Sequence, residues 1–99
     1  MTVRHCPYQG VKKMRYLFMA EHLPEQLREL KRQGMPALDA YMDQVQKDYG
    51  RTITEYVNHW GKTHQHLKQP DNWDPWFKGL KMAEHQAEEI AIRNVVEAL

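Results

Sequence analysis

The stretch that decides the fold is residues 38–67, LDAYMDQVQKDYGRTITEYVNHWGKTHQHL. Its apolar residues, with one histidine, recur at steps of three and four, the spacing that keeps one face of an α-helix apolar. The members of this stripe are Leu38, Tyr41, Met42, Val45, Tyr49, Ile53, Tyr56, Val57, Trp60, His64 and Leu67. The pattern passes Gly50 and Gly61 without a break, so it predicts a rod of roughly 45 Å at ~1.5 Å per residue.

A helix is expected before the rod, after an irregular N-terminus at residues 1–9. Apolar residues recur at helical spacing from Val11 to Phe18. Pro24 either bends this helix or starts a second one at its first turn. The apolar face continues as far as Gly34, which is well placed to end the helix.

The last helix is expected after the turn-forming run QPDN at residues 69–72. Asp74 is a good N-cap residue for it, with a proline following. Apolar residues then continue at helical spacing from Trp76 and Phe77 to the C-terminus. The whole chain is therefore expected to be a single all-α domain, a three-helix bundle with a long central helix and a first helix bent near Pro24.

Composition predicts a cytoplasmic protein without a membrane segment. Of 99 residues, 41% are hydrophobic, and 14 Lys and Arg nearly balance 13 Asp and Glu. This balance disfavours both a globally basic nucleic-acid binder and an acidic DNA mimic. The single cysteine, Cys6, excludes an internal disulfide and favours a reducing compartment. No apolar run approaches the ~20 residues of a membrane span.

Two places carry more apolar surface than one stripe requires. Residues 16–20 (YLFMA) are apolar on all sides of a helix, and Ile92, Val96 and Leu99 form a second face near the C-terminus. Such surfaces are either buried centrally in a bundle or belong to a dimer seam or a partner-binding patch. Both alternatives stay open at this point.

The basic and aromatic start of the first helix is the candidate contact site. Residues 1–32 carry a net charge of +4, so cations there would steer a partner and aromatic side chains would anchor it. Trp60 and Trp76 are expected in the core, whereas Trp73 is either a staple residue or a second anchor. The candidate contact residues are Lys12, Lys13, Arg15, Tyr16, Phe18, Met19 and Trp73.

The histidines do not by themselves predict a metal or catalytic site. At ~100° per residue, His59 and His66 share a helical face and His64 lies away from both. A zinc site there requires a bend at Gly61. The acidic residues and histidine of the last helix suit a solvated, charge-supported face. We therefore expect no enzyme, no metal and no cofactor.

A DNA-binding hypothesis fits poorly. Residues 27–42 resemble a helix, a glycine-containing turn and a second helix. The segment that would enter the major groove carries Asp39 and Asp43 and no basic group, so phosphates repel it. Only weak, non-specific contact of the basic first helix with a nucleic-acid backbone is expected.

Two segments match a known family in their spacing. Residues 76–96 run from Trp-Phe through Ala-Glu-Glu-Ile to Val-Val, and residues 22–34 carry a His-x-Pro step, a leucine and a glycine. With a weaker match at residues 40–42, these segments resemble the TnpV-type transposon-encoded proteins. Lys81 and Glu84 depart from that family's Asn and basic residue. The resemblance implies accessory cargo of bacterial mobile elements and carries over no active-site residue.

The expected function is therefore non-catalytic. We expect a small mobile-element protein, from a transposon or phage, that binds a protein or nucleoprotein partner such as a nuclease or a transposition protein. One concrete form is an anti-CRISPR-type inhibitor of an RNA-guided Cas nuclease. Another is a DNA-associated transposition accessory factor. A homodimer is a further alternative.

Overall fold

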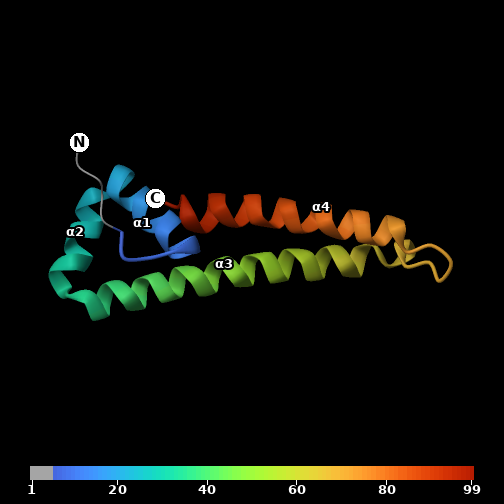
Figure 1. Ribbon diagram of the computed structural model, residues 1–99, viewed down its shortest axis with the longest axis horizontal. Coiled ribbons are helices and arrows are strands. Elements are labelled where there is room, and N and C mark those ends of the chain that lie inside the picture. The colour runs from blue at the N-terminus through green and yellow to red at the C-terminus, as the bar shows by residue number, and fades with distance from the viewer. Residues whose placement is uncertain (1–5) are drawn as a thin grey trace.

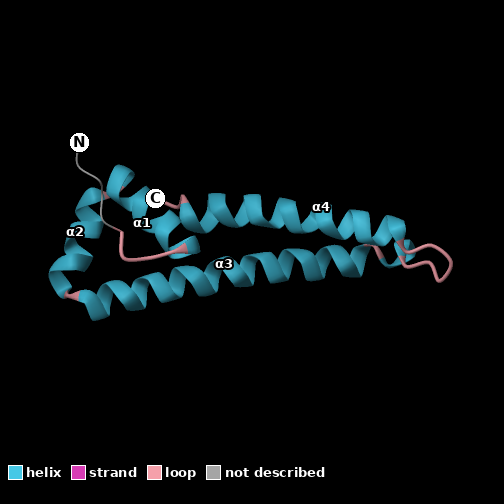
Figure 2. Ribbon diagram, viewed as in Figure 1, coloured by secondary structure: helices cyan, strands magenta, loops and turns pink. Residues whose placement is uncertain are grey.

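The structure, a computed structural model, describes residues 6–99 as a set of helices joined by loops (Figure 2). Helices α3 (Met35–Thr63) and α4 (Asp74–Ala91) form a long antiparallel hairpin, while α1 (Gly10–His22) and α2 (Pro24–Gln33) pack at the end away from its connecting loop (Figure 1). The molecule measures 58 × 28 × 20 Å. The all-α class and the long central helix are confirmed. Within the described part of the chain, no helix is long and apolar enough to cross a membrane.

The predicted irregular N-terminus falls partly outside what the structure describes. Residues 1–5 lie outside the described residues, and residues 6–9 form an extended loop that leads into α1. The Tyr8 hydroxyl in this loop donates a hydrogen bond to Asp39 Oδ1 at 2.6 Å. The loop is thereby fastened to the first turns of α3.

Helix α3 is the rod that the apolar stripe predicts. It is 29 residues long and passes through both Gly50 and Gly61. It ends before the stripe does, because His64 leaves helical geometry with φ −122° and ψ 27°. The chain then tightens into the 3₁₀ turn η1 (Gln65–Leu67), which carries the last stripe residue.

Pro24 starts a second helix rather than bending the first. Its ring lacks the N–H that would bond back into α1, and Leu23 takes a non-helical φ of −133°. The N–H of Leu23 still donates to the Met19 carbonyl at 2.8 Å, so α1 and α2 meet at a single residue. Gly34 ends α2 as expected, with a φ of +108° that residues with a Cβ rarely adopt.

Both ends of α4 differ from expectation. Asp74 lies inside the first turn and does not cap it, and the Asn72 side chain accepts the Asp74 N–H at 3.2 Å instead. At the other end the α-helix gives way to η2 (Ile92–Val96), a π-helical turn that ends before the C-terminus. There the Glu97 N–H donates to the Ile92 carbonyl five residues earlier, at 2.8 Å.

The core is thickest where α1 and α2 meet the beginning of α3. The cluster there consists of Tyr16, Met19, Leu27, Leu38 and Met42. Farther along the hairpin, α4 buries only small side chains, Ala83, Ala87 and Ala91. Because alanine allows two helix backbones to approach closely, α4 lies tightly against α3 although few large residues are fully covered.

Candidate interaction surfaces

The basic start of α1 is folded onto α3. The ammonium of Lys12 bonds Asp43 Oδ1 at 2.5 Å. That hydrogen bond and the positive charge of Lys12 hold the pKa of the Asp43 carboxyl below its usual range. Lys13, by contrast, is exposed. The charge of Lys12 is thus already matched within the chain, whereas Lys13 faces solvent.

Arg15 lies inside the protein and cannot be a surface contact in this structure. Its side chain is only 4% exposed. Nε and Nη2 donate to the Tyr41 hydroxyl at 3.1 and 2.8 Å, and Nη1 donates to the carbonyls of Val96 and Ala98 at 2.9 and 2.6 Å. A cation is favoured beside the carbonyl end of a helix. Arg15 therefore ties α1 to α3 and to the end of the last helix.

The other α1 residues predicted to contact a partner are buried or half-buried. Tyr16 and Met19 are core residues, so the expectation that they contact a partner is replaced by the alternative of central burial. Phe18 is half-buried, with the Arg15 guanidinium 5.5 Å from its ring centroid and the His22 ring 4.6 Å away. These residues are buried because helices pack around α1 on several sides, as an all-round apolar helix requires.

The second surface, which we name the aromatic tip, consists of Trp73 and Phe77 at the loop end of the hairpin. Trp73 is 43% exposed, Phe77 is 55% exposed, and their ring centroids lie 6.2 Å apart. The sequence pattern placed Phe77 on the buried stripe of α4, which was wrong because Trp76, one residue earlier, faces α3 instead. The four-residue step from Trp73 to Phe77 is the signal that could have revealed the pair.

A second set of rings joins α3 to α4 at the same end of the hairpin. Trp60 and Trp76 are half-buried with centroids 5.1 Å apart, and His64 stacks on Trp60 at 4.5 Å with an interplanar angle of 12°. A Cβ added at Gly79 would lie 2.5 Å from Trp60 Cζ2, so the indole rests directly on the α4 backbone. The ammonium of Lys68 covers the Trp76 ring at 4.6 Å. These contacts hold the start of α4, the helix that carries Phe77, against the end of α3.

The zinc hypothesis finds no support in this arrangement. His64 Nδ1 lies 2.8 Å from the Trp60 carbonyl, which makes that nitrogen a donor and not a metal ligand. The His66 ring centroid is 5.9 Å from that of His64, and His59 is exposed. Among residues 6–99, no group of three His, Cys, Asp or Glu side chains is placed to hold a metal ion.

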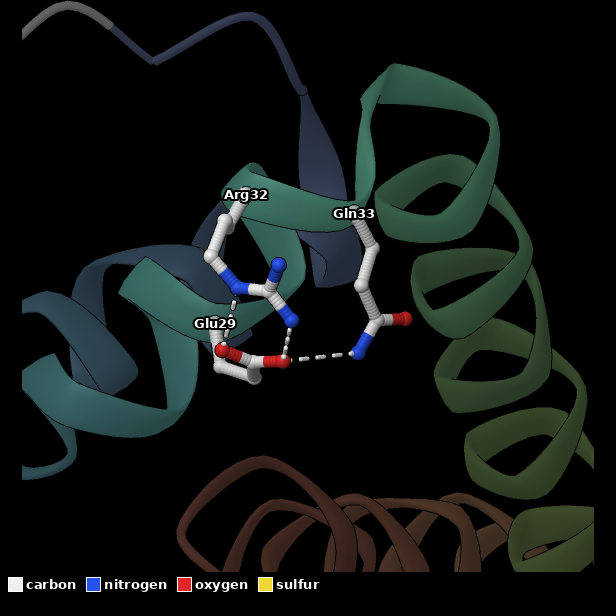
Figure 3. Close-up of polar contacts among 3 residues, drawn as sticks. All are labelled: Glu29, Arg32 and Gln33. Carbon is white, nitrogen blue, oxygen red and sulfur yellow. Dashed lines mark hydrogen bonds and ion pairs between the residues drawn. The ribbon is translucent and has the colours of Figure 1, made fainter.

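A polar cluster on α2 has an ordinary structural explanation. Arg32 donates to both carboxylate oxygens of Glu29, at 2.8 and 2.5 Å, and Gln33 Nε2 adds a third hydrogen bond at 3.3 Å (Figure 3). The bond from Arg32 is the main cause that lowers the pKa of the Glu29 carboxyl. All of this occurs between neighbouring turns of one exposed helix, as is typical of a solvated face.

Fold and surfaces together define an all-α protein built on one long helical hairpin. No protein-family model matches this chain, and no curated protein and no solved structure is similar to it. The resemblance to the TnpV-type proteins accordingly stays a prediction from the sequence. Only the surfaces of the molecule therefore indicate what it binds.

Proposed function

We propose that the protein acts by binding a protein partner through the aromatic tip, without catalysing a reaction. The observation that carries this proposal is the exposure of the neighbouring Trp73 and Phe77 rings at the loop end of the hairpin. Large aromatic side chains are enriched among the residues that dominate binding energy. Because Trp76 and Gly79 hold the start of α4 against Trp60 of α3, the helix that carries Phe77 need not rearrange when a partner covers the tip.

Charge around the tip indicates the chemistry of the partner surface. The hairpin end carries the cations Lys62, Lys68, Lys78 and Lys81. Over residues 61–81 they exceed the two aspartates, which leaves a net charge of +2. An apolar surface with an acidic rim is the complement of such a tip, because opposite charges steer association and suppress wrong partners.

The mobile-element setting is part of this proposal and is supported only by the resemblance of residues 22–34 and 76–96 to the TnpV-type proteins. In that setting the protein is cytoplasmic and its partner is a nuclease or a transposition protein. The specific form that we propose is inhibition of an RNA-guided Cas nuclease by covering a protein surface. A near-neutral net charge of +1 suits such a mode better than imitation of a nucleic acid.

A DNA-associated accessory factor is the alternative. Two cations of the predicted basic cluster serve other purposes, because Lys12 pairs with Asp43 and Arg15 is buried. A DNA-binding protein loses affinity steeply as salt rises, since each phosphate contact releases counterions. Retention on duplex DNA with a steep salt response would favour this alternative, and a flat response would eliminate it.

The proposal is tested by binding to purified RNA-guided nucleases and transposition proteins on a sensor surface. The wild-type chain is compared with the double variant Trp73→Ala and Phe77→Ala. Met35→Ala is the matched control, because Met35 is also an exposed apolar residue, at 51% exposure, but begins α3 at the opposite end of the hairpin. We expect binding by the wild type and the control and at least a tenfold loss in the double variant. Equal binding by all three would refute a role for the tip.

A further inference from the structure

One side of the hairpin is covered by α1 only near the start of α3. The polar contacts of α1 and of the loop before it reach α3 at Asp39, Tyr41 and Asp43. Helix α1 starts beside this region and runs away from the tip, so the half of the hairpin nearer the tip consists of α3 and α4 alone (Figure 1). A third helix is therefore present at one end of the molecule and missing at the other.

An open groove lies in the half that α1 leaves uncovered. Its volume is about 320 Å³, at the lower end of the range for binding pockets. The half-buried side chains of Ile53 and Val57 make its apolar part, and Glu84 and Glu88 of α4 make an acidic rim. The complete lining is Ile53, Thr54, Val57, Asn58, Glu84 and Glu88.

The groove lies in line with α1. Ile53 follows Asp39 by fourteen residues, and Val57 follows Asp43 by the same interval. Fourteen residues return to nearly the same face of a helix, within about 40°. The face of α3 that contacts Tyr8 and Lys12 thus continues into the groove. A helix bound there would contact an apolar surface, because Ile53 and Val57 lie where Asp39 and Asp43 lie beside α1.

The rim makes the groove negatively charged. Glu84 and Glu88 are exposed, and the lining includes no cation. Burial raises the pKa of the Tyr49 hydroxyl on α3, and the negative charge of the nearby Glu88 raises it further. An occupant that buries its apolar residues here therefore gains if it carries cations beside them.

We infer that this groove is the docking site for an amphipathic helix of a protein partner, one that carries Lys or Arg on either side of its apolar stripe. Such a helix completes the three-helix packing that α1 provides at the other end. Between Tyr49 and Gly61 the track is roughly 18 Å long, which suits about three helical turns. The inference rests on the proposed function in requiring a protein partner, but it concerns a different surface.

A second copy of the chain is the less suitable occupant. A two-fold dimer places the same patch of both copies at the interface. Two grooves facing each other would then bring the Glu84 and Glu88 side chains of both copies together, and like charges in contact disfavour association. The charge of the rim thus favours a basic helix from a different protein.

The probe for the test is a fluorescein-labelled 14-residue peptide with leucines at positions one, four, five, eight and eleven, flanked by lysines. Its partner peptide has glutamates in place of every lysine. Fluorescence anisotropy measures binding of both to the full chain at physiological salt. We expect the lysine peptide to bind at least tenfold more tightly, and the double variant Glu84→Lys and Glu88→Lys to reverse that preference.

The matched control carries the same change in net charge elsewhere. Glu55→Lys with Glu89→Lys alters two exposed glutamates that do not line the groove, and it should leave the preference unchanged. If this control reverses the preference equally, the effect is one of overall charge and the inference is wrong. Failure of the wild-type chain to bind either peptide overturns it as well.

Two further measurements locate the site and the occupant. Amide chemical shifts on titration with the lysine peptide should change around Ile53 and Val57. Changes confined to Trp73 and Phe77 would refute the groove and leave the aromatic tip intact as a binding site. The double tip variant should still bind the peptide, so the two proposals fail separately. A dimer in sedimentation equilibrium that dissociates with the Glu84 and Glu88 substitutions would assign the groove to a second copy and overturn the inference.

Discussion

Replacing Arg15 by methionine should destabilise the protein by about 3 kcal/mol. Methionine keeps most of the buried aliphatic volume but offers no donor, so the Val96 carbonyl and the Tyr41 hydroxyl lose their partner. Each buried group left without a hydrogen bond costs ~1–3 kcal/mol. Removing a buried charge recovers part of its desolvation cost, which offsets roughly 1 kcal/mol of the loss. Only the bond to the Val96 carbonyl is buried, and its loss accounts for about 2 kcal/mol. The bonds to the Tyr41 hydroxyl and the Ala98 carbonyl are partly buried, so water replaces the guanidinium in part and each adds about 1 kcal/mol.

The assay is urea unfolding followed by circular dichroism at 222 nm, with thermal unfolding as a second measurement. For a domain of this size a loss of 3 kcal/mol lowers Tm by about 12–24 °C. Lys13→Met is the matched control, since it removes an exposed cation two residues earlier on α1 and should change stability little. The double variant Arg15→Met with Tyr41→Phe should lose about 1 kcal/mol less stability than the sum of the two single variants, because both substitutions remove the same hydrogen bonds. If Arg15→Met costs no more than Lys13→Met, the bonds to the end of the last helix do not stabilise the fold.

Two further outcomes follow from single contacts. Gly79→Ala should lower the free energy of unfolding by about 1–3 kcal/mol, because a Cβ there would lie 2.5 Å from the Trp60 ring. Gly50→Ala is the control in the same urea assay and should not destabilise the fold, because its Cβ would meet open space on α3. Equal effects of the two substitutions would contradict the close approach of Trp60 to α4. The Asp43 carboxyl should titrate by NMR below its ordinary pKa of 3.8 and return toward that value in Lys12→Ala. Since the folded-state pKa is lowered, the pair of Lys12 and Asp43 stabilises the fold at pH values above the ordinary pKa, and this contribution is lost as pH falls through the lowered value. An unchanged Asp43 titration in Lys12→Ala would rule out the pairing.

Much of the fold was predictable because the decisive signals are local. The stripe of residues 38–67 specifies a long helix through its spacing alone, and Gly34 and the turn at residues 69–72 end helices for reasons of backbone geometry. Pro24 left two alternatives open because a proline both bends a helix and suits the first turn of one. The choice between them depends on Leu23. A proline disfavours the α region for the residue before it, and Leu23 takes a non-helical φ of −133° and ψ of 52°, so Pro24 begins a new helix.

The contact residues were less predictable because burial depends on distant parts of the chain. Lys13 and Arg15 are equivalent in a charge count, yet one faces solvent and the other binds carbonyls more than 80 residues away. That difference arises from where the last helix ends, which depends on the length of the whole hairpin. A cluster of cations and aromatic residues on one helix therefore says little about which members are exposed until the helices around it are placed.

The stripe itself distinguishes the two halves of the hairpin. Leu38, Met42 and Val45 are buried where α1 lies alongside, but Ile53 and Val57 are only half-buried although they belong to the same periodic face. A helix that packs against only one other helix needs only a narrow apolar stripe facing that helix. The additional apolar width beyond residue 50 is explained if a third helix packs there as α1 packs before it. A partner helix in the groove accounts for this width, and the acidic rim beside it predicts the charge that such a helix carries.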